Sequence, residues 1–94
     1  LLLIDTFHMN IEESSIIQSI KKFGSLIGHV HIADSNRKAP GLGHIDFLSI
    51  IIQLLEVNYG GFLSAEIIPY PDFEEASRLT IEFYRKISSR LNIR

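Results

Sequence analysis

The feature that most constrains the fold of this chain is a threefold alternation of short apolar runs with longer amphipathic segments. Strand-like runs occupy residues 1–4, 25–33 and 62–68. Each is followed by a helical pattern, predicted at about residues 11–23, 47–57 and 73–91. Alternating units of this kind specify a parallel sheet with right-handed crossovers. We therefore expect an α/β fold, and the pattern alone leaves open whether the sheet is flat or part of a barrel.

Each predicted helix begins at a side chain that can cap it. Asn10, Asp46 and Asp72 are N-cap residue types, and Glu13 and Glu75 follow the first and the last by three residues, as reciprocal capping partners do. The helical spacing of apolar residues predicts the buried faces. These faces comprise Ile16, Ile20 and Phe23, then Leu48, Ile51, Ile52 and Leu55, and finally Ala76, Leu79, Phe83 and Ile87.

Composition limits the function classes. The 94 residues are 46% apolar and 21% charged, which suits one small globular domain. A net charge of -2 without a basic patch argues against nucleic-acid binding. The absence of cysteine excludes disulfides and thiolate metal sites. Because every apolar run is far shorter than the ~20 residues that span a bilayer, we expect no membrane segment and a cytoplasmic protein.

Each predicted strand ends near a residue that can bind a cation, namely Asp5, His31 and Glu66. The carboxyl ends of neighbouring parallel strands, ~4.8 Å apart, meet at the edge where ligands bind. Asp5 could instead cap a turn, and His31 could be a hydrogen-bonded core residue. Glu66 lies within an apolar run, where a buried carboxylate is costly unless it is paired or bound to metal. The three together predict a site for a divalent ion.

Two further residues fall close to these strand ends. His8 follows Asp5 by three residues, and Arg37 follows His31 by six, in a loop able to fold back over the sheet edge. A guanidinium there could hold a substrate oxygen without deprotonating. Both side chains could equally be solvated loop residues. His44 and Asp46 are most simply assigned to the loop and to the helix cap.

Four segments that contain these residues resemble a known family. They are Asp-Thr-Phe-His-Met-Asn-Ile-Glu at 5–12, His-Val-His-Ile-Ala-Asp at 29–34, Asn-Arg at 36–37 with Pro-Gly-Leu-Gly-His-Ile-Asp at 40–46, and Ser-Ala-Glu-Ile at 64–67. They are similar to the last three βα units of xylose isomerase-like TIM barrels, in the branch of the D-tagatose and D-psicose 3-epimerases. The resemblance covers nearly the whole chain and is weaker in the final helix.

The resemblance implies that residues 1–94 form the C-terminal portion, strands 6 to 8, of a single (β/α)8 barrel domain. It implies a divalent ion, usually Mn²⁺ with Mg²⁺ or Co²⁺ possible, held by Asp5, His31 and Glu66 and by a glutamate on the preceding strand. It also implies that His8 and Arg37 bind substrate oxygens. A complete barrel has about 250 residues, and the chain starts inside a strand without methionine, so we expect a piece of a longer protein.

The leading functional hypothesis is therefore a metal-dependent ketose 3-epimerase or isomerase acting on a small sugar or sugar derivative. Glu66 would be both a metal ligand and a catalytic proton-transfer group, forming a metal-stabilised enediolate. The isolated piece would be inactive without the N-terminal half of the barrel. Because three strands leave two unpaired edges, we expect it to associate, for example as a homo-oligomer.

Two alternatives remain open at this stage. An endonuclease IV-type phosphoesterase shares the barrel and similar Asp-x-x-His and His-x-x-Asp-Ser patterns. That class needs further metal ligands where this chain has Asn36, Arg37 and Lys38. The second alternative is a non-catalytic half-barrel that functions only by association.

Overall fold

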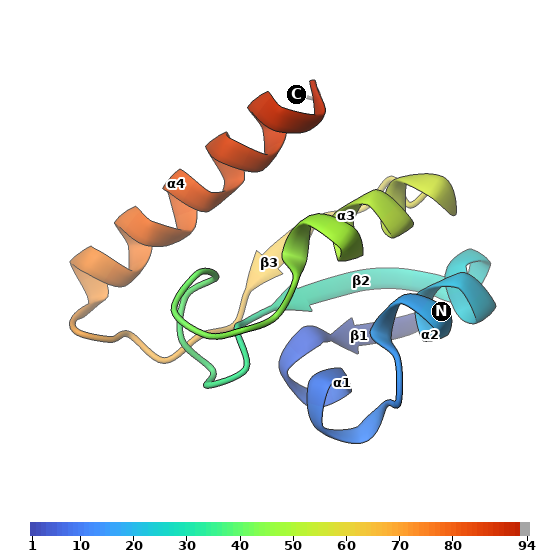
Figure 1. The fold of residues 1–94 in the computed structure, drawn as a ribbon, viewed down its shortest axis with the longest axis horizontal. Helices are drawn as coiled ribbons and strands as arrows, with labels where there is room; N and C mark the ends of the chain where they lie inside the picture. The colour runs from blue at the N-terminus through green and yellow to red at the C-terminus, as the bar shows by residue number, and fades with distance from the viewer. Residues whose placement is uncertain (93–94) are drawn as a thin grey trace.

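Three parallel strands form the sheet, as the sequence predicts. The structure is a computed structural model that describes residues 1–92. Its strands are β1 (Leu2–Asp5), β2 (Ile27–Ile32) and β3 (Leu63–Ala65), and β2 lies between the other two (Figure 1). Both pairings are parallel, with Asp5 opposite His31 and His31 opposite Ser64. The carboxyl ends of all three strands are therefore at one edge.

The first helical segment differs from the prediction. Instead of one helix over 11–23, the chain forms α1 (Thr6–Glu12) and α2 (Ile16–Phe23), followed by a 3-10 turn, η1 (Gly24–Leu26). The predicted cap Asn10 lies inside α1, and the caps are Asp5 and Ser15, whose side chains accept the N–H groups of His8 and Gln18. Because Asp5 and Ser15 each cap the start of a separate helix, one continuous helix is disfavoured. The segment therefore divides at Ser14–Ser15.

The other two helices begin as predicted. Helix α3 (Phe47–Glu56) begins at Asp46, which accepts the N–H of Ser49. Helix α4 (Phe73–Leu91) begins at Asp72, which accepts the N–H of Glu75. Helix α3 itself carries apolar residues on almost every side, so its sequence alone permits several different faces to be buried.

Packing selects a stripe on α3 that differs from the predicted one. Ile51 is buried as predicted, but Ile52 is 38% and Leu55 43% exposed, whereas Ile50 and Leu54 are almost fully buried. On α2 the same correction applies to Phe23, which is 39% exposed. The core joins these buried helix faces to β2. It consists of Ile20, Ile27, Val30, Ile32, Phe47, Ile50 and Leu54.

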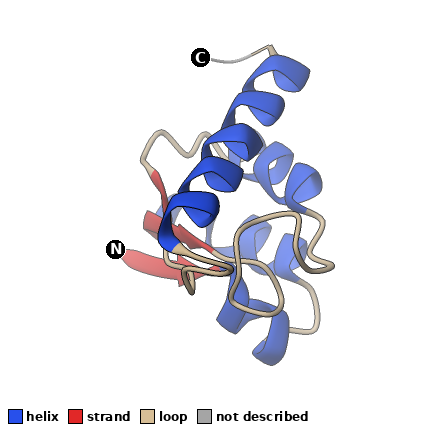
Figure 2. Cartoon of the chain, turned by 90° about the vertical axis from the view of Figure 1, so that its left-hand side faces the viewer, coloured by secondary structure: helices blue, strands red, loops and turns tan. Residues whose placement is uncertain are grey.

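The helices gather on one side of the sheet and leave its other side open (Figure 2). Along β2, Val30 and Ile32 face the helices, while the half-buried His29 and His31 face the open side, as strand alternation predicts. Over residues 1–92, none of the helices combines the length and the apolar character needed to cross a membrane.

Candidate functional site

The site is built around Asp5, the last residue of β1 and the N-cap of α1. Its backbone stays extended while its carboxylate Oδ1 accepts the backbone N–H of His8 at 3.2 Å. Because Asp5 is in register with His31 on β2, the two side chains lie side by side. The carboxylate Oδ2 is 3.9 Å from His31 Nδ1, and both side chains are largely screened from solvent.

Thr6 fixes this register at the next residue. Its hydroxyl donates to the carbonyl of Ala33 at 2.8 Å and accepts the N–H of Ala33 at 3.0 Å, and both residues are fully buried. The Thr6 side chain thereby continues the link between the two strands for one residue beyond the end of β2. The sequence reasoning missed Thr6, and a threonine between a strand-end aspartate and an aromatic residue is too weak a signal to identify it.

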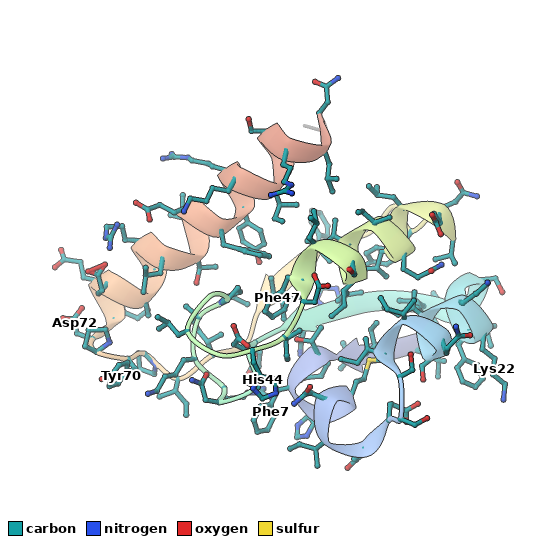
Figure 3. All side chains as sticks on the ribbon, viewed as in Figure 1. Phe7, Lys22, His44, Phe47, Tyr70 and Asp72 are labelled. Carbon is teal, nitrogen blue, oxygen red and sulfur yellow. The ribbon has the colours of Figure 1, made fainter. Side chains whose placement is uncertain are left out.

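Arg37 lies over the same carboxylate. Its Nη1 is 3.1 Å from Asp5 Oδ1, and its guanidinium is 5.0 Å from the centre of the Phe7 ring. Phe7 lies on the first turn of α1, beneath the loop that follows β2 (Figure 3). The Arg37 backbone is left-handed, with φ of 67°, and its carbonyl accepts the N–H of Ile68 at 2.8 Å. The loop therefore folds back over the strand ends, as predicted.

Asp34, which the sequence reasoning did not single out, is a buried carboxylate in the loop behind the pocket, with 1% exposure. Burial alone would raise its pKa. The backbone N–H groups of Ile45, Ser35, Gly41 and Gly43 outweigh this and hold the pKa of Asp34 below its usual value. The group is therefore ionised at neutral pH.

Glu66 differs from its prediction in burial. It lies one residue beyond β3, where its N–H donates to the carbonyl of Ile32 at 3.0 Å, and its side chain is exposed, not buried. β3 is only three residues long and pairs on one side, so nothing among residues 1–92 covers this position. His8 is also exposed, on the first turn of α1.

One pocket brings the predicted residues together. It has a volume of about 500 Å³. All five residues singled out from the sequence line it: Asp5, His8, His31, Arg37 and Glu66. Leu3, Met9, Glu12 and Glu13 complete the lining. The pocket therefore carries carboxylates, imidazoles and one guanidinium, a set suited to binding a polyhydroxylated molecule and moving its protons.

The fit to a divalent ion is partial. Two ligands each about 2.1 Å from one ion lie at most about 4.2 Å apart, so the 3.9 Å between Asp5 Oδ2 and His31 Nδ1 is compatible with a shared ion. Glu66 lines the same pocket. Across residues 1–92, however, no three histidine, aspartate or glutamate side chains are grouped closely enough to hold a metal.

Comparison with known proteins extends these observations. A family model described as "Xylose isomerase-like TIM barrel" matches residues 1–87. D-psicose 3-epimerase of Ruminiclostridium cellulolyticum is 39% identical over 87 residues, which are 93% of this chain and 29% of that protein.

Two solved structures have the same fold over most of the chain. The apo crystal structure of 3-keto-D-glucoside 4-epimerase from E. coli is 39% identical, with a TM-score of 0.82, covering 89% of this chain and 32% of that one. The D-allulose 3-epimerase of Methylomonas sp. in complex with D-allulose is 29% identical, with a TM-score of 0.81, covering 92% and 36%. The chain thus has part of a TIM-barrel fold and spans about a third of these relatives.

Proposed function

Because the chain belongs to the xylose isomerase-like TIM barrel family, we propose that the protein containing it is a ketose epimerase or isomerase that acts on a small sugar. The observation that carries the proposal is the shared pocket, which five residues chosen from the sequence line together. The similar proteins named above are sugar epimerases. They lend support to a sugar isomerase and none to a phosphoesterase.

In this proposal Asp5, His31 and Glu66 hold a divalent ion, Mn²⁺ in preference to Mg²⁺ or Co²⁺. Oxygen and imidazole donors suit these ions, and the adjacency of Asp5 and His31 supports a common site. When bound, the ion supplies Lewis-acid stabilisation of negative charge on substrate oxygens. Glu66, which lines the same pocket, would be the third ligand.

Arg37 and His8 bind and orient the sugar. A guanidinium carries several N–H donors in a planar fork, so Arg37 can donate to hydroxyl or enediolate oxygens throughout the reaction. Its contacts with Asp5 and Phe7 hold it in place before substrate arrives. His8, exposed at the pocket wall, can donate to a second oxygen from the N-terminal turn of α1.

Glu66 transfers the proton. Its carboxylate removes the proton from the carbon next to the ketose carbonyl, giving an enediolate, and a second acid on the opposite face returns a proton to complete epimerisation. We propose that this second group and the fourth metal ligand belong to one glutamate on the preceding strand of the barrel. Exposed apolar side chains on the two outer strands, Leu3 within β1 and Phe62 just before β3, support a protein in which further structure covers them.

Glu66→Gln in the intact protein tests the mechanism. We expect a loss of about 10² to 10⁴-fold in kcat for interconversion of D-fructose and D-psicose, with loss of solvent deuterium incorporation into the sugar, because the amide cannot accept the proton. Glu74→Gln is the matched control, since Glu74 is exposed on α4 and does not line the pocket. A Glu66→Gln protein that retains wild-type turnover would refute the proposal.

A further inference from the structure

Asp34 closes a tight turn at the end of β2 through its backbone. Its N–H donates to the carbonyl of Lys38, and its carbonyl accepts the N–H of Arg37, both at 2.9 Å. Between these bonds Arg37 takes a left-handed conformation, with φ of 67°. This conformation is unfavourable for a residue with a Cβ, so the turn needs support from its surroundings.

The Asp34 side chain supplies that support from within the loop. Oδ1 accepts the N–H of Ser35 at 2.8 Å and that of Ile45 at 3.0 Å, while Oδ2 accepts the N–H of Gly41 at 2.8 Å. The carboxylate thereby binds both the outgoing and the returning limbs of residues 34–46. Gly43 passes so close that a Cβ there would collide with Asp34 Oδ1.

Arg37 is the residue of this turn that lines the pocket. Its guanidinium contacts Asp5 and covers the ring of Phe7, and its carbonyl binds the N–H of Ile68 beyond β3. Asp34 itself does not line the pocket. Any influence of its carboxylate on bound sugar must therefore pass through the loop that it ties together.

We infer that Asp34 is a positioning residue, whose buried carboxylate fixes the 34–46 loop so that Arg37 faces the pocket in a binding-ready orientation. The inference rests on the proposed function for its effect on ketose binding. It adds to that function a residue that sets affinity without touching the sugar. Loss of the carboxylate would leave Arg37 present and charged but free to leave Asp5 and Phe7, so ketose binding would weaken while Glu66 chemistry would not change.

The test compares Asp34→Asn with Asp46→Asn in the intact protein. Asp34→Asn puts an amide NH2 group where a carboxylate oxygen now accepts a backbone N–H. Asp46, by contrast, is an exposed N-cap of α3 that lies outside the pocket. We expect Asp34→Asn to raise KM for D-psicose about tenfold with kcat changed less than threefold, since the binding that is lost is shared equally by the ground state and the transition state. We expect less than a twofold change in KM for Asp46→Asn.

A double-mutant cycle separates positioning from a general structural role. If Asp34 acts through Arg37, adding Asp34→Asn to Arg37→Gln should change KM less than twofold. The NMR signal of the Arg37 Nε–H gives a second readout that needs no turnover, because the Phe7 ring shifts it. Asp34→Asn should move this signal toward its position in Phe7→Leu. Should Asp34→Asn not fold, Gly43→Ala displaces the same carboxylate, and we expect a KM increase of about threefold.

Three outcomes decide the matter. An unchanged Arg37 signal and KM in Asp34→Asn, or Gly43→Ala in its place, would overturn the inference. So would multiplicative KM effects of Asp34→Asn and Arg37→Gln. A wild-type protein that neither binds nor converts ketoses would instead refute the proposed function, and the Arg37 signal would still show whether Asp34 orients that side chain.

Discussion

The pocket lies between a β1–β2 side and a β3 side of the fold, here called its two walls, and the two differ in how fully the described chain supports them. On the β1–β2 side, the polar groups of Thr6, Asp34 and Arg37 all have partners within hydrogen-bond distance. On the β3 side, the strand has three residues and Glu66 is exposed. The apolar side chains there are also open to solvent, with Phe62 79% and Phe73 77% exposed.

This difference indicates where the site is self-sufficient. The positions of Asp5, His31 and Arg37 follow from strand register and from one loop, both within this chain. The position of Glu66 depends on what lies beside β3. The part of the pocket that holds Asp5, His31 and Arg37 is thus fixed locally, and we expect the position of the Glu66 side chain to be fixed only when further structure covers β3.

The largest expected effect is at Thr6, on the well-built wall. Thr6→Val keeps the shape of the side chain but leaves the N–H and C=O of Ala33 without this partner in a fully buried place. We expect about 3 kcal/mol of destabilisation, since each unsatisfied buried group costs about 1 to 3 kcal/mol. Urea unfolding of the variant and the wild type measures it.

Thr80→Val on α4 is the matched control for this substitution. Thr80 is also buried, but its hydroxyl only adds a second hydrogen bond to the Ala76 carbonyl, which belongs to the helix ladder. We expect Thr80→Val to lower the free energy of unfolding by roughly 0.5 kcal/mol. Equal losses for Thr6→Val and Thr80→Val would remove the distinction between the two walls.

A smaller, pH-dependent effect is expected at Asp34. At pH 7 we expect Asp34→Asn to be about 2 kcal/mol less stable than wild type, because hydrogen bonds to a charged acceptor are lost. The pKa of folded Asp34 lies below its ordinary value of 3.8. Its stabilisation is therefore complete above about pH 4 and is lost as the pH falls through the folded value.

Stability curves for the two proteins across this range check the sign. The difference in free energy of unfolding between wild type and Asp34→Asn should narrow below about pH 4. From about pH 4 to neutrality this difference should remain constant. A gap that widens on acidification would show that the carboxylate is not stabilised in the folded protein.

The smallest effect on stability is expected at Phe73, beside the open β3 wall but outside the pocket. Phe73 lines an apolar groove of about 430 Å³ between β3 and α4. Phe73→Ser should change the free energy of unfolding by less than about 0.5 kcal/mol, because the ring is already exposed. It should nevertheless reduce self-association of the 94-residue chain, measured by light scattering, since exposed apolar surface beside a strand edge favours association.

Ile11→Ser provides the comparison for association. Ile11 is 65% exposed on α1, on the other side of the sheet from β3 in strand order. A chain that stays associated after Phe73→Ser, or loses association equally after Ile11→Ser, would show that the β3 wall is not the preferred contact surface.

Much of the architecture could be predicted from periodicity and caps. The structure confirms the three strands, their alternation with helices and the first residues of α3 and α4. The helix starts were predictable because Asp46 and Asp72 cap their helices through hydrogen bonds to residues only three positions further along the chain. The division of residues 6–23 into α1 and α2 was not predicted. There Asn10 matched the capping pattern, but Asp5 and Ser15 form the actual caps.

The sequence by itself determined which residues reach the pocket: a strand-end position in a parallel sheet sets the edge at which Asp5, His31 and Glu66 emerge, whatever the packing. Only the tertiary structure decided how each is held. Burial and orientation depend on neighbours far along the chain, so the stripe that α3 buries, the bonds of Thr6 to Ala33, the ties of Asp34 across its loop and the exposure of Glu66 could not be predicted from local pattern.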